Sequence, residues 1–258
     1  MYNQTFFPNV DVAAVITALF VMFFIGLVAY LRREDRREGY PLEDDVTGRL
    51  EPSPGLFFSA LPKTFILPHG HGNLTVPTGA RDSREMNARP TARAAGSPLA
   101  PVGDPLLAGV GPGSYAHRAK RPDTLVHGET KIAPLSRCPG FSLDPNDAPL
   151  IGMPVVGADG ETAGLIRDVW IDRSEYLIRY IEIELASSGR RVLAPMPMVN
   201  VRRRKRRVEV NALLASQFAG APTLENPEQI TFDEEERVVA YYGGGLLYAT
   251  PTRLEPYL

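Results

Sequence analysis

An unbroken apolar segment near the N-terminus constrains this chain more than any other feature. The twenty residues of segment 12–31 carry no charged side chain, and four arginines follow within residues 32–37. At about 1.5 Å rise per residue, twenty helical residues span the roughly 30 Å hydrocarbon core of a bilayer. The segment therefore predicts one transmembrane helix over residues 12–31.

Two other structures could use such a segment. A cleaved secretory signal has a basic start, a core of about 7–15 apolar residues and a small-residue cleavage site. Residues 1–11 contain no Lys or Arg, and charged residues follow the apolar run. A buried core helix rarely extends this far without a polar face. An uncleaved anchor is favoured over both alternatives.

The charges beside the segment predict its orientation. Basic residues next to a membrane segment stay in the cytoplasm, so the N-terminus is expected outside and the large C-terminal part inside. Tyr30 and Arg33 stand where an interfacial aromatic and a phosphate-pairing cation are expected, which predicts contact with lipid headgroups. Ordinary flanking anchors explain the two residues equally well.

The composition excludes several classes of protein. A formal net charge of −2 and a pI near 6.1 argue against bulk electrostatic binding of nucleic acid. The single cysteine, Cys138, can form neither an internal disulfide nor a cysteine metal cluster, which fits a reducing compartment. No nucleophile, phosphate-loop or metalloprotease motif is present, and the pair His69 and His71 is weak as a metal site.

Proline and glycine are dense from about residue 52 to residue 154, which nearly excludes long helices. Disorder would be the default for such a stretch. However, it contains the apolar islands Phe57-Phe58, Phe65–Leu67 and Leu106-Leu107, which are unfavourable in water. We therefore predict an extended region that depends on a partner for its cover.

Six short runs with tight turns between them predict a small antiparallel β-barrel. They are Met153–Val156, Gly164–Ile171, Tyr176–Leu185, Arg191–Ala194, Val199–Arg202 and Arg207–Val210. Two short helices are expected after them. The first covers Ala212–Phe218; the second begins at Asn226-Pro227 and runs to Tyr242, where Gly243–Gly245 should stop it.

Two charged groups within this domain could carry function. The basic run 202–207 has three interpretations: a solvated hairpin tip, a contact with anionic lipid or an acidic partner, or a nucleic-acid contact. The second group contains Asp168, Asp172, Glu175 and Arg179. Two carboxylates close together would have one raised pKa and could exchange protons near neutral pH, but a surface ion-pair network is the plainer interpretation.

Eight short segments occur in an order that is specific only as a set. They are REGYPLE (37–43), PKTFILPHG (62–70), LTVP (74–77), GDP (103–105), GVGP (109–112), DVWID (168–172), APMPMVNV (194–201) and FAGAPT (218–223). With the anchor, they closely resemble the H subunits of the purple-bacterial photosynthetic reaction centre.

This resemblance implies a fold and a set of partners. The implied fold is a single transmembrane helix plus a mainly-β cytoplasmic domain, a PRC-type barrel with short C-terminal helices and an extended Pro/Gly-rich linker. The implied division is 1–11 periplasmic, 12–31 transmembrane, 32–145 extended and 146–258 barrel, in the photosynthetic inner membrane. The implied partners are the L and M subunits and lipid; a cytochrome subunit and the core light-harvesting antenna are further candidates, and nucleic acid is not expected.

The resemblance also implies what the chain contributes. It would be a non-catalytic subunit that binds no redox cofactor, because bacteriochlorophyll, bacteriopheophytin, quinones, carotenoid and non-haem iron belong to L and M. It would shield the quinone sites and supply part of the proton route to the secondary quinone. Glu175 resembles the family's buried glutamate near that quinone, and Asp172 and Arg179 resemble its neighbours.

Two further positions resemble the point where protons enter. His127 matches one of two histidines found there in some members, and Glu129 replaces the second. The rival hypothesis is a membrane-tethered PRC-barrel adaptor with a regulatory or scaffolding role. That hypothesis explains the anchor and the barrel but not the ordered motifs in 37–112.

Overall fold

The structure, a computed structural model, describes residues 11–52, 55, 59–79 and 86–254. Its contacts divide the chain into two units, residues 1–84 with 93–96, and residues 85–92 with 97–258. The predicted apolar pair Phe57-Phe58 lies outside the described residues.

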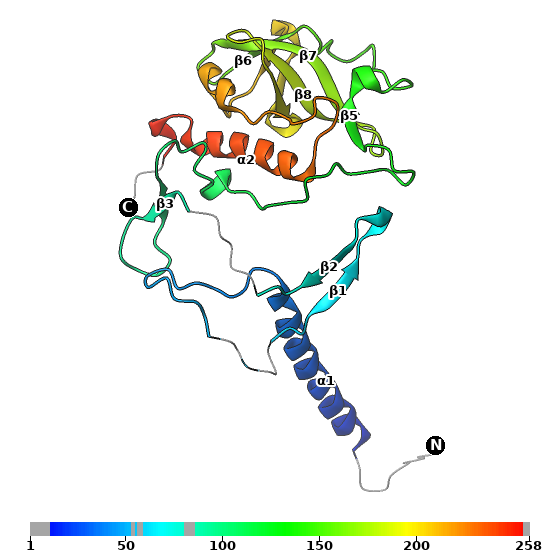
Figure 1. Ribbon diagram of the computed structural model, residues 1–258, viewed down its shortest axis with the longest axis vertical. Helices are drawn as coiled ribbons and strands as arrows, with labels where there is room; N and C mark the ends of the chain where they lie inside the picture. The colour runs from blue at the N-terminus through cyan, green and yellow to red at the C-terminus, as the bar shows by residue number, and fades with distance from the viewer. Residues whose placement is uncertain (1–10, 53–54, 56–58, 80–85, 255–258) are drawn as a thin grey trace. The chain divides into compact units, whose positions relative to one another are not determined.

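Helix α1 (Val12–Glu34) forms the predicted membrane span (Figure 1). Asp11 caps its N-terminus, because the Asp11 carboxylate accepts hydrogen bonds from the N–H groups of Ala13 and Ala14. No residue of α1 is buried, and its most apolar 18-residue window has a mean hydropathy of 2.8. The helix continues three residues beyond the predicted end, because arginine and glutamate are good helix formers.

A β-hairpin follows in the same unit. Strands β1 (Lys63–Ile66) and β2 (Asn73–Val76) pair antiparallel. Arg37, just after α1, donates from Nη1 to the carbonyl oxygens of Leu61 and Val76 at 2.6 and 3.1 Å. One guanidinium therefore fastens the base of the hairpin to the end of the helix.

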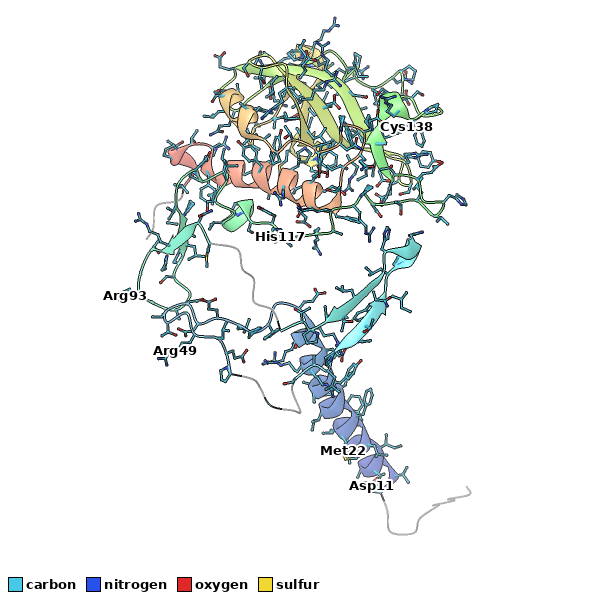
Figure 2. The ribbon with its side chains drawn as sticks, viewed as in Figure 1. Asp11, Met22, Arg49, Arg93, His117 and Cys138 are labelled. Carbon is cyan, nitrogen blue, oxygen red and sulfur yellow. The ribbon has the colours of Figure 1, made fainter. Side chains whose placement is uncertain are left out.

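The described part of the chain before Leu106 has no core of its own. None of its described residues is buried. Ile66 of β1 is 85 % exposed, and the side chains of α1, including Met22, project outward from the helix (Figure 2). The apolar surface of this part is therefore available to lipid or to other chains.

The second unit is built on a seven-stranded sheet with the order β10-β11-β6-β7-β8-β9, in which β5 also pairs with β7. Its strands are β5 (Ile132–Pro134), β6 (Pro154–Val156), β7 (Thr162–Asp172), β8 (Leu177–Leu185), β9 (Arg191–Pro195), β10 (Asn200–Arg202) and β11 (Arg207–Glu209). A separate two-stranded sheet contains β3 (Ala88–Pro90) and β4 (Leu99–Pro101).

All six predicted strands are present, but the prediction of a wholly antiparallel barrel is wrong. Strands β11 and β6 pair in parallel, with Val208 opposite Val155. The alternation of side chains reports which face is buried and carries no information about the direction of a neighbouring strand. The seventh strand, β5, was not predicted, because a buried run of three residues ending in proline shows no alternation.

The core of this unit packs between the strands and helix α2. Its largest side chains without solvent contact include Trp170, Tyr242 and Phe218. Leu106 and Cys138, from the stretch rich in proline and glycine, belong to the same cluster. The second part of that stretch is therefore packed against the barrel.

Helix α2 (Phe232–Tyr248) begins later and ends later than predicted. Thr231 and Glu234 form a capping box, which sets the start at Phe232 rather than at residue 226. The three glycines at 243–245 lie inside the helix. A Cβ at Gly243 would stand 2.6 Å from the Pro112 carbonyl oxygen, so glycine here permits close packing instead of ending the helix.

The first predicted C-terminal helix is a 3-10 helix, Ala215–Gly220, and not an α-helix. Its first turn is held by Gln217, whose side-chain oxygen accepts a hydrogen bond from the Leu214 N–H at 2.9 Å. The segment is too short to gain from the regular α-helical pattern, and a 3-10 turn is common at such lengths.

Candidate functional site

The turn between β7 and β8 brings together two of the predicted carboxylates. Asp172, the last residue of β7, is 1 % exposed. Its Oδ1 accepts hydrogen bonds from the N–H and hydroxyl of Ser174 and from the N–H of Glu175, at 2.9, 2.7 and 3.0 Å. These bonds close the turn and place Glu175 directly beside the buried aspartate.

Lys131 lies beside both carboxylates, and no motif in the sequence indicated it. Its Nζ lies 3.4 Å from Asp172 Oδ2 and 3.7 Å from both Glu175 Oε1 and Asp123 Oδ2. The pairing of β5 with β7, with Ile132 opposite Asp172, brings the lysine there. One ammonium group thus faces three carboxylates from two distant parts of the chain.

The charges shift the pKa values within this cluster. Burial opposes ionisation of Asp172, but the hydrogen bonds from Ser174 and Glu175 and the charge of Lys131 outweigh it, so the pKa of Asp172 is lowered. Burial also opposes the charged form of Lys131, yet the facing carboxylates raise its pKa. Asp172 therefore stays ionised at neutral pH, which is what the ion-pair interpretation of this group expects for that carboxylate.

Arg179 belongs to a second, neighbouring group. Its Nη2 lies 3.8 Å from Glu235 Oε2, and the Tyr180 hydroxyl donates to the same oxygen at 2.9 Å. Burial raises the pKa of Glu235, and the hydrogen bond from Tyr180 and the charge of Arg179 only partly offset this rise. The carboxyl group with a raised pKa is therefore Glu235 on α2, which the sequence did not reveal.

Both groups line one cleft of about 610 Å³ between the barrel and α2. Its wall includes Asp123, Lys131, Asp172, Arg179 and Glu235. Asp172 Oδ2 accepts no hydrogen bond from the described residues, although it is buried. A chain of water molecules in such a cleft can link ionisable groups by hydrogen bonds.

The two residues predicted where protons enter lie on the loop before β5. Glu129 accepts a hydrogen bond from Arg173 at 2.6 Å, and Arg173 also donates to the Thr130 carbonyl oxygen. His127 is exposed at the tip of this loop. Arg173 and Lys131 therefore join the loop to the turn that carries Glu175.

Asp168 does not join the predicted cluster. It lies earlier on β7, where its carboxylate accepts hydrogen bonds from the N–H groups of Val169 and Ser136. Strand geometry explains the difference, because four residues along an extended strand span about 13 Å. Proximity in sequence therefore overstated the size of the cluster.

The remaining predicted residues lie in the first unit or at exposed turns. Tyr30 is 55 % exposed on α1, and Arg33 is half-buried with an Nε that makes no hydrogen bond to the described residues. The rings of His69 and His71 lie 6.3 Å apart at the β1–β2 turn. No group of three or more metal-ligating side chains suited to a metal ion occurs among the described residues.

Two protein-family models match the chain in succession. The model for the N-terminal region of the photosynthetic reaction centre H-chain matches residues 4–137. The PRC-barrel domain model matches residues 146–216. The first match covers just over half of the chain, including the segment that the adaptor hypothesis left unexplained.

The chain belongs to the reaction-centre H-chain family. This confirms the predicted family and the predicted fold class, a single apolar anchor followed by a mainly-β domain of the PRC-barrel type. As an H subunit it is a membrane-anchored structural component that associates with other reaction-centre subunits.

Proposed function

We propose that this H subunit covers the cytoplasmic side of the L and M subunits and conducts protons toward the secondary quinone. The observation that carries the proposal is the position of Glu175. Its side chain is 53 % exposed in the isolated chain, yet it stands 3.7 Å from Lys131 beside the buried Asp172. Glu175 is accessible to a partner subunit and also lies beside the charged residues of the cleft. Such a carboxylate is suited to pass protons across a subunit interface.

Apolar side chains around Glu175 support an interface at this point. Tyr176 is 80 % exposed and Leu177 is 41 % exposed, and the Tyr176 ring lies 5.3 Å from that of Phe141. Tyr176 also has a φ of 56°, a conformation that costs a non-glycine residue free energy. A partner subunit that covers this patch would bury Glu175 and raise its affinity for a proton.

The residues of the proposed route would have different roles in proton transfer. Protons would enter near His127 and Glu129, whose loop Arg173 fastens to the turn of Glu175. Glu235, whose pKa burial raises, would bind a proton more readily than an exposed carboxylate does. Lys131 and the anion Asp172 would set the potential that steers protons to Glu175.

The quinones and pigments would be held by L and M, and this chain's residues would only bind water, exclude it or move protons. The orientation belongs to the same proposal. The arginines of 32–37 support a periplasmic N-terminus and a cytoplasmic domain, in the photosynthetic inner membrane. Tyr30 and Arg33 would contact lipid headgroups at the cytoplasmic surface.

Replacing Glu175 with glutamine tests the proposed role. In the assembled reaction centre, E175Q should slow the second, proton-coupled electron transfer to the secondary quinone on the order of tenfold. Primary charge separation should keep its wild-type rate. Flash-induced absorbance and proton uptake measure both steps. The exposed Glu161, on the turn before β7, provides the matched control E161Q. An unchanged second-electron rate in E175Q would overturn the assignment of Glu175.

The capping role has its own test. Limited proteolysis of the chain alone should cut residues 59–79 and 86–100 rapidly, because none of these is buried. The same segments should be protected in the complex with L and M. Residues 132–138 should resist cleavage in both samples, since Ile132 and Cys138 belong to the barrel core. Equal protection of segment 59–79 with and without the partners would contradict the capping role.

A further inference from the structure

The turn between β10 and β11 holds four cations that the fold does not use. The basic run 202–207 lies in a hairpin, and the arginines at its two ends share one carboxylate of the following strand. Arg202 and Arg207 both bind Glu209, at 2.8 and 2.6 Å, and their hydrogen bonds lower the pKa of Glu209 to about 2. The middle of the run, residues 203–206, is exposed and makes no side-chain hydrogen bond or ion pair with the described residues.

The backbone of this turn gives no reason for its charge. Arg203–Lys205 form a 3-10 turn, and Arg206 follows in the left-handed conformation with a φ of 48°. Glycine or asparagine adopts that conformation more readily than arginine does. Four like charges on consecutive residues also repel one another. Since neither turn geometry nor packing requires the cations, they fit a contact outside the chain.

We propose that residues 203–206 bind the anionic headgroups of the membrane that holds the chain. The surroundings favour lipid over a protein partner. A protein interface usually has an apolar core inside a polar rim. Among the residues of β10, β11 and the turn between them, no large hydrophobic side chain is exposed. The run also lacks the aromatic side chains on which nucleic-acid bases stack.

The chemistry of the cations fits lipid phosphates. Three of the four are arginines, whose planar guanidinium can donate two parallel hydrogen bonds to one phosphate. Each Lys or Arg near an anionic membrane surface contributes about fivefold to affinity. Because helix α1 anchors the chain in the same membrane, the contact would form at a high effective concentration. The inference does not depend on the proton route.

Trypsin accessibility of the turn tests the contact in the assembled complex. The reaction centre is placed in nanodiscs of phosphatidylcholine alone or with phosphatidylglycerol. Cleavage within residues 203–206 is compared with cleavage at Arg190, an exposed residue of the β8–β9 turn, as the internal reference. We expect cleavage of the turn to be roughly tenfold slower in anionic discs, and high salt to remove the difference.

Two variants separate charge from other causes of protection. R203Q/R204Q/K205Q keeps Arg206 as a cleavage site and should be cut at the same rate in both lipids. R203K/R204K keeps the charge and should retain the protection. Equal cleavage of the wild-type turn in the two lipids would overturn the proposal. Slow cleavage of the turn relative to Arg190 in both lipids would also overturn the proposal. In that case a protein partner, and not anionic lipid, would cover the turn.

Discussion

The two units of this chain differ in whether their apolar side chains are buried within the chain. In the second unit, strands and α2 enclose side chains such as Trp170 and Ile183, which have no solvent contact. In the first unit, the described residues include exposed Phe65, Ile66 and Leu74 on a two-stranded hairpin. A two-stranded hairpin has too little burial to be stable alone in water.

This difference indicates which part of the subunit depends on its surroundings to bury apolar surface. Burial of apolar surface is the main favourable contribution to folding, and among the described residues only those of the second unit are buried within the chain. The described residues of the first unit leave the apolar side chains of α1 and of the hairpin exposed. The two units therefore differ in how far they can fold on their own contacts, although both contain β-strands.

The largest expected effect compares the same substitution in the two units. I183A removes a side chain with no exposure and should destabilise the chain by about 2–5 kcal/mol. I66A, at an 85 % exposed position, should change stability by less than about 0.5 kcal/mol. Denaturant unfolding of the full chain in detergent, followed by the fluorescence of Trp170, the only tryptophan, measures both. Equal losses of unfolding free energy in I183A and I66A would show that the two units do not differ in burial as described.

In the assembled complex the second substitution should behave differently. If partners cover the hairpin, I66A should weaken the association of this subunit with L and M. Detergent-dependent dissociation of the complex, with wild type alongside, measures the change. An unaltered dissociation curve would place Ile66 outside the interface.

The next effect concerns the buried carboxylate of the second unit. D172N removes an anion that holds the β7–β8 turn and faces Lys131, and should destabilise the barrel by roughly 2 kcal/mol at pH 7. Because the pKa of Asp172 is lowered, its contribution exists above its ordinary value of 3.8 and is lost as the pH falls through the folded value. The difference between wild type and D172N should therefore shrink in acid.

The exposed Asp147 provides the matched control, since D147N makes the same chemical change outside the site. Its unfolding midpoint should follow that of wild type across the same pH range. A D172N curve parallel to wild type down to low pH would show that Asp172 does not act as a stabilising anion.

A smaller effect is expected in the first unit. R37Q removes two hydrogen bonds from the Arg37 guanidinium to carbonyl oxygens at the base of the hairpin, which contribute about 1–2 kcal/mol locally. Amide hydrogen exchange in β1 and β2 should speed up about tenfold, with no shift in the Trp170 unfolding midpoint. R49Q, at an exposed position, is the control (Figure 2). A shifted midpoint would mean that the two units unfold together.

The smallest effect is a pH dependence. The pKa of Glu235 is raised, so the protonated form is the one that the fold prefers. Stability should therefore decrease as the pH rises from the ordinary value of 4.5 through the folded pKa, and E235Q should lack this decrease. Unfolding midpoints between pH 4.5 and 8 compare the two. Parallel curves would remove Glu235 as a proton-holding group in the cleft.

Much of the fold could be predicted because its signals are local. An uncharged run of twenty residues, alternating side chains and turn residues each act within a few neighbours along the chain. Direction and closure of the sheet are different, because they depend on which strands meet. The parallel pair of β6 and β11 and the three glycines inside α2 were decided by long-range packing.

The same distinction between local signals and long-range packing applies to the candidate site. The membrane anchor, the placing of Asp172 and Glu175 on one turn, and the basic run 202–207 could all be predicted from the sequence alone. The three-dimensional structure was needed to show that Lys131 faces both carboxylates, that Arg179 pairs with Glu235, and that residues 203–206 have no side-chain partner among the described residues. The partners and the burial of an ionisable group come from residues far away in the chain, and no local pattern specifies them.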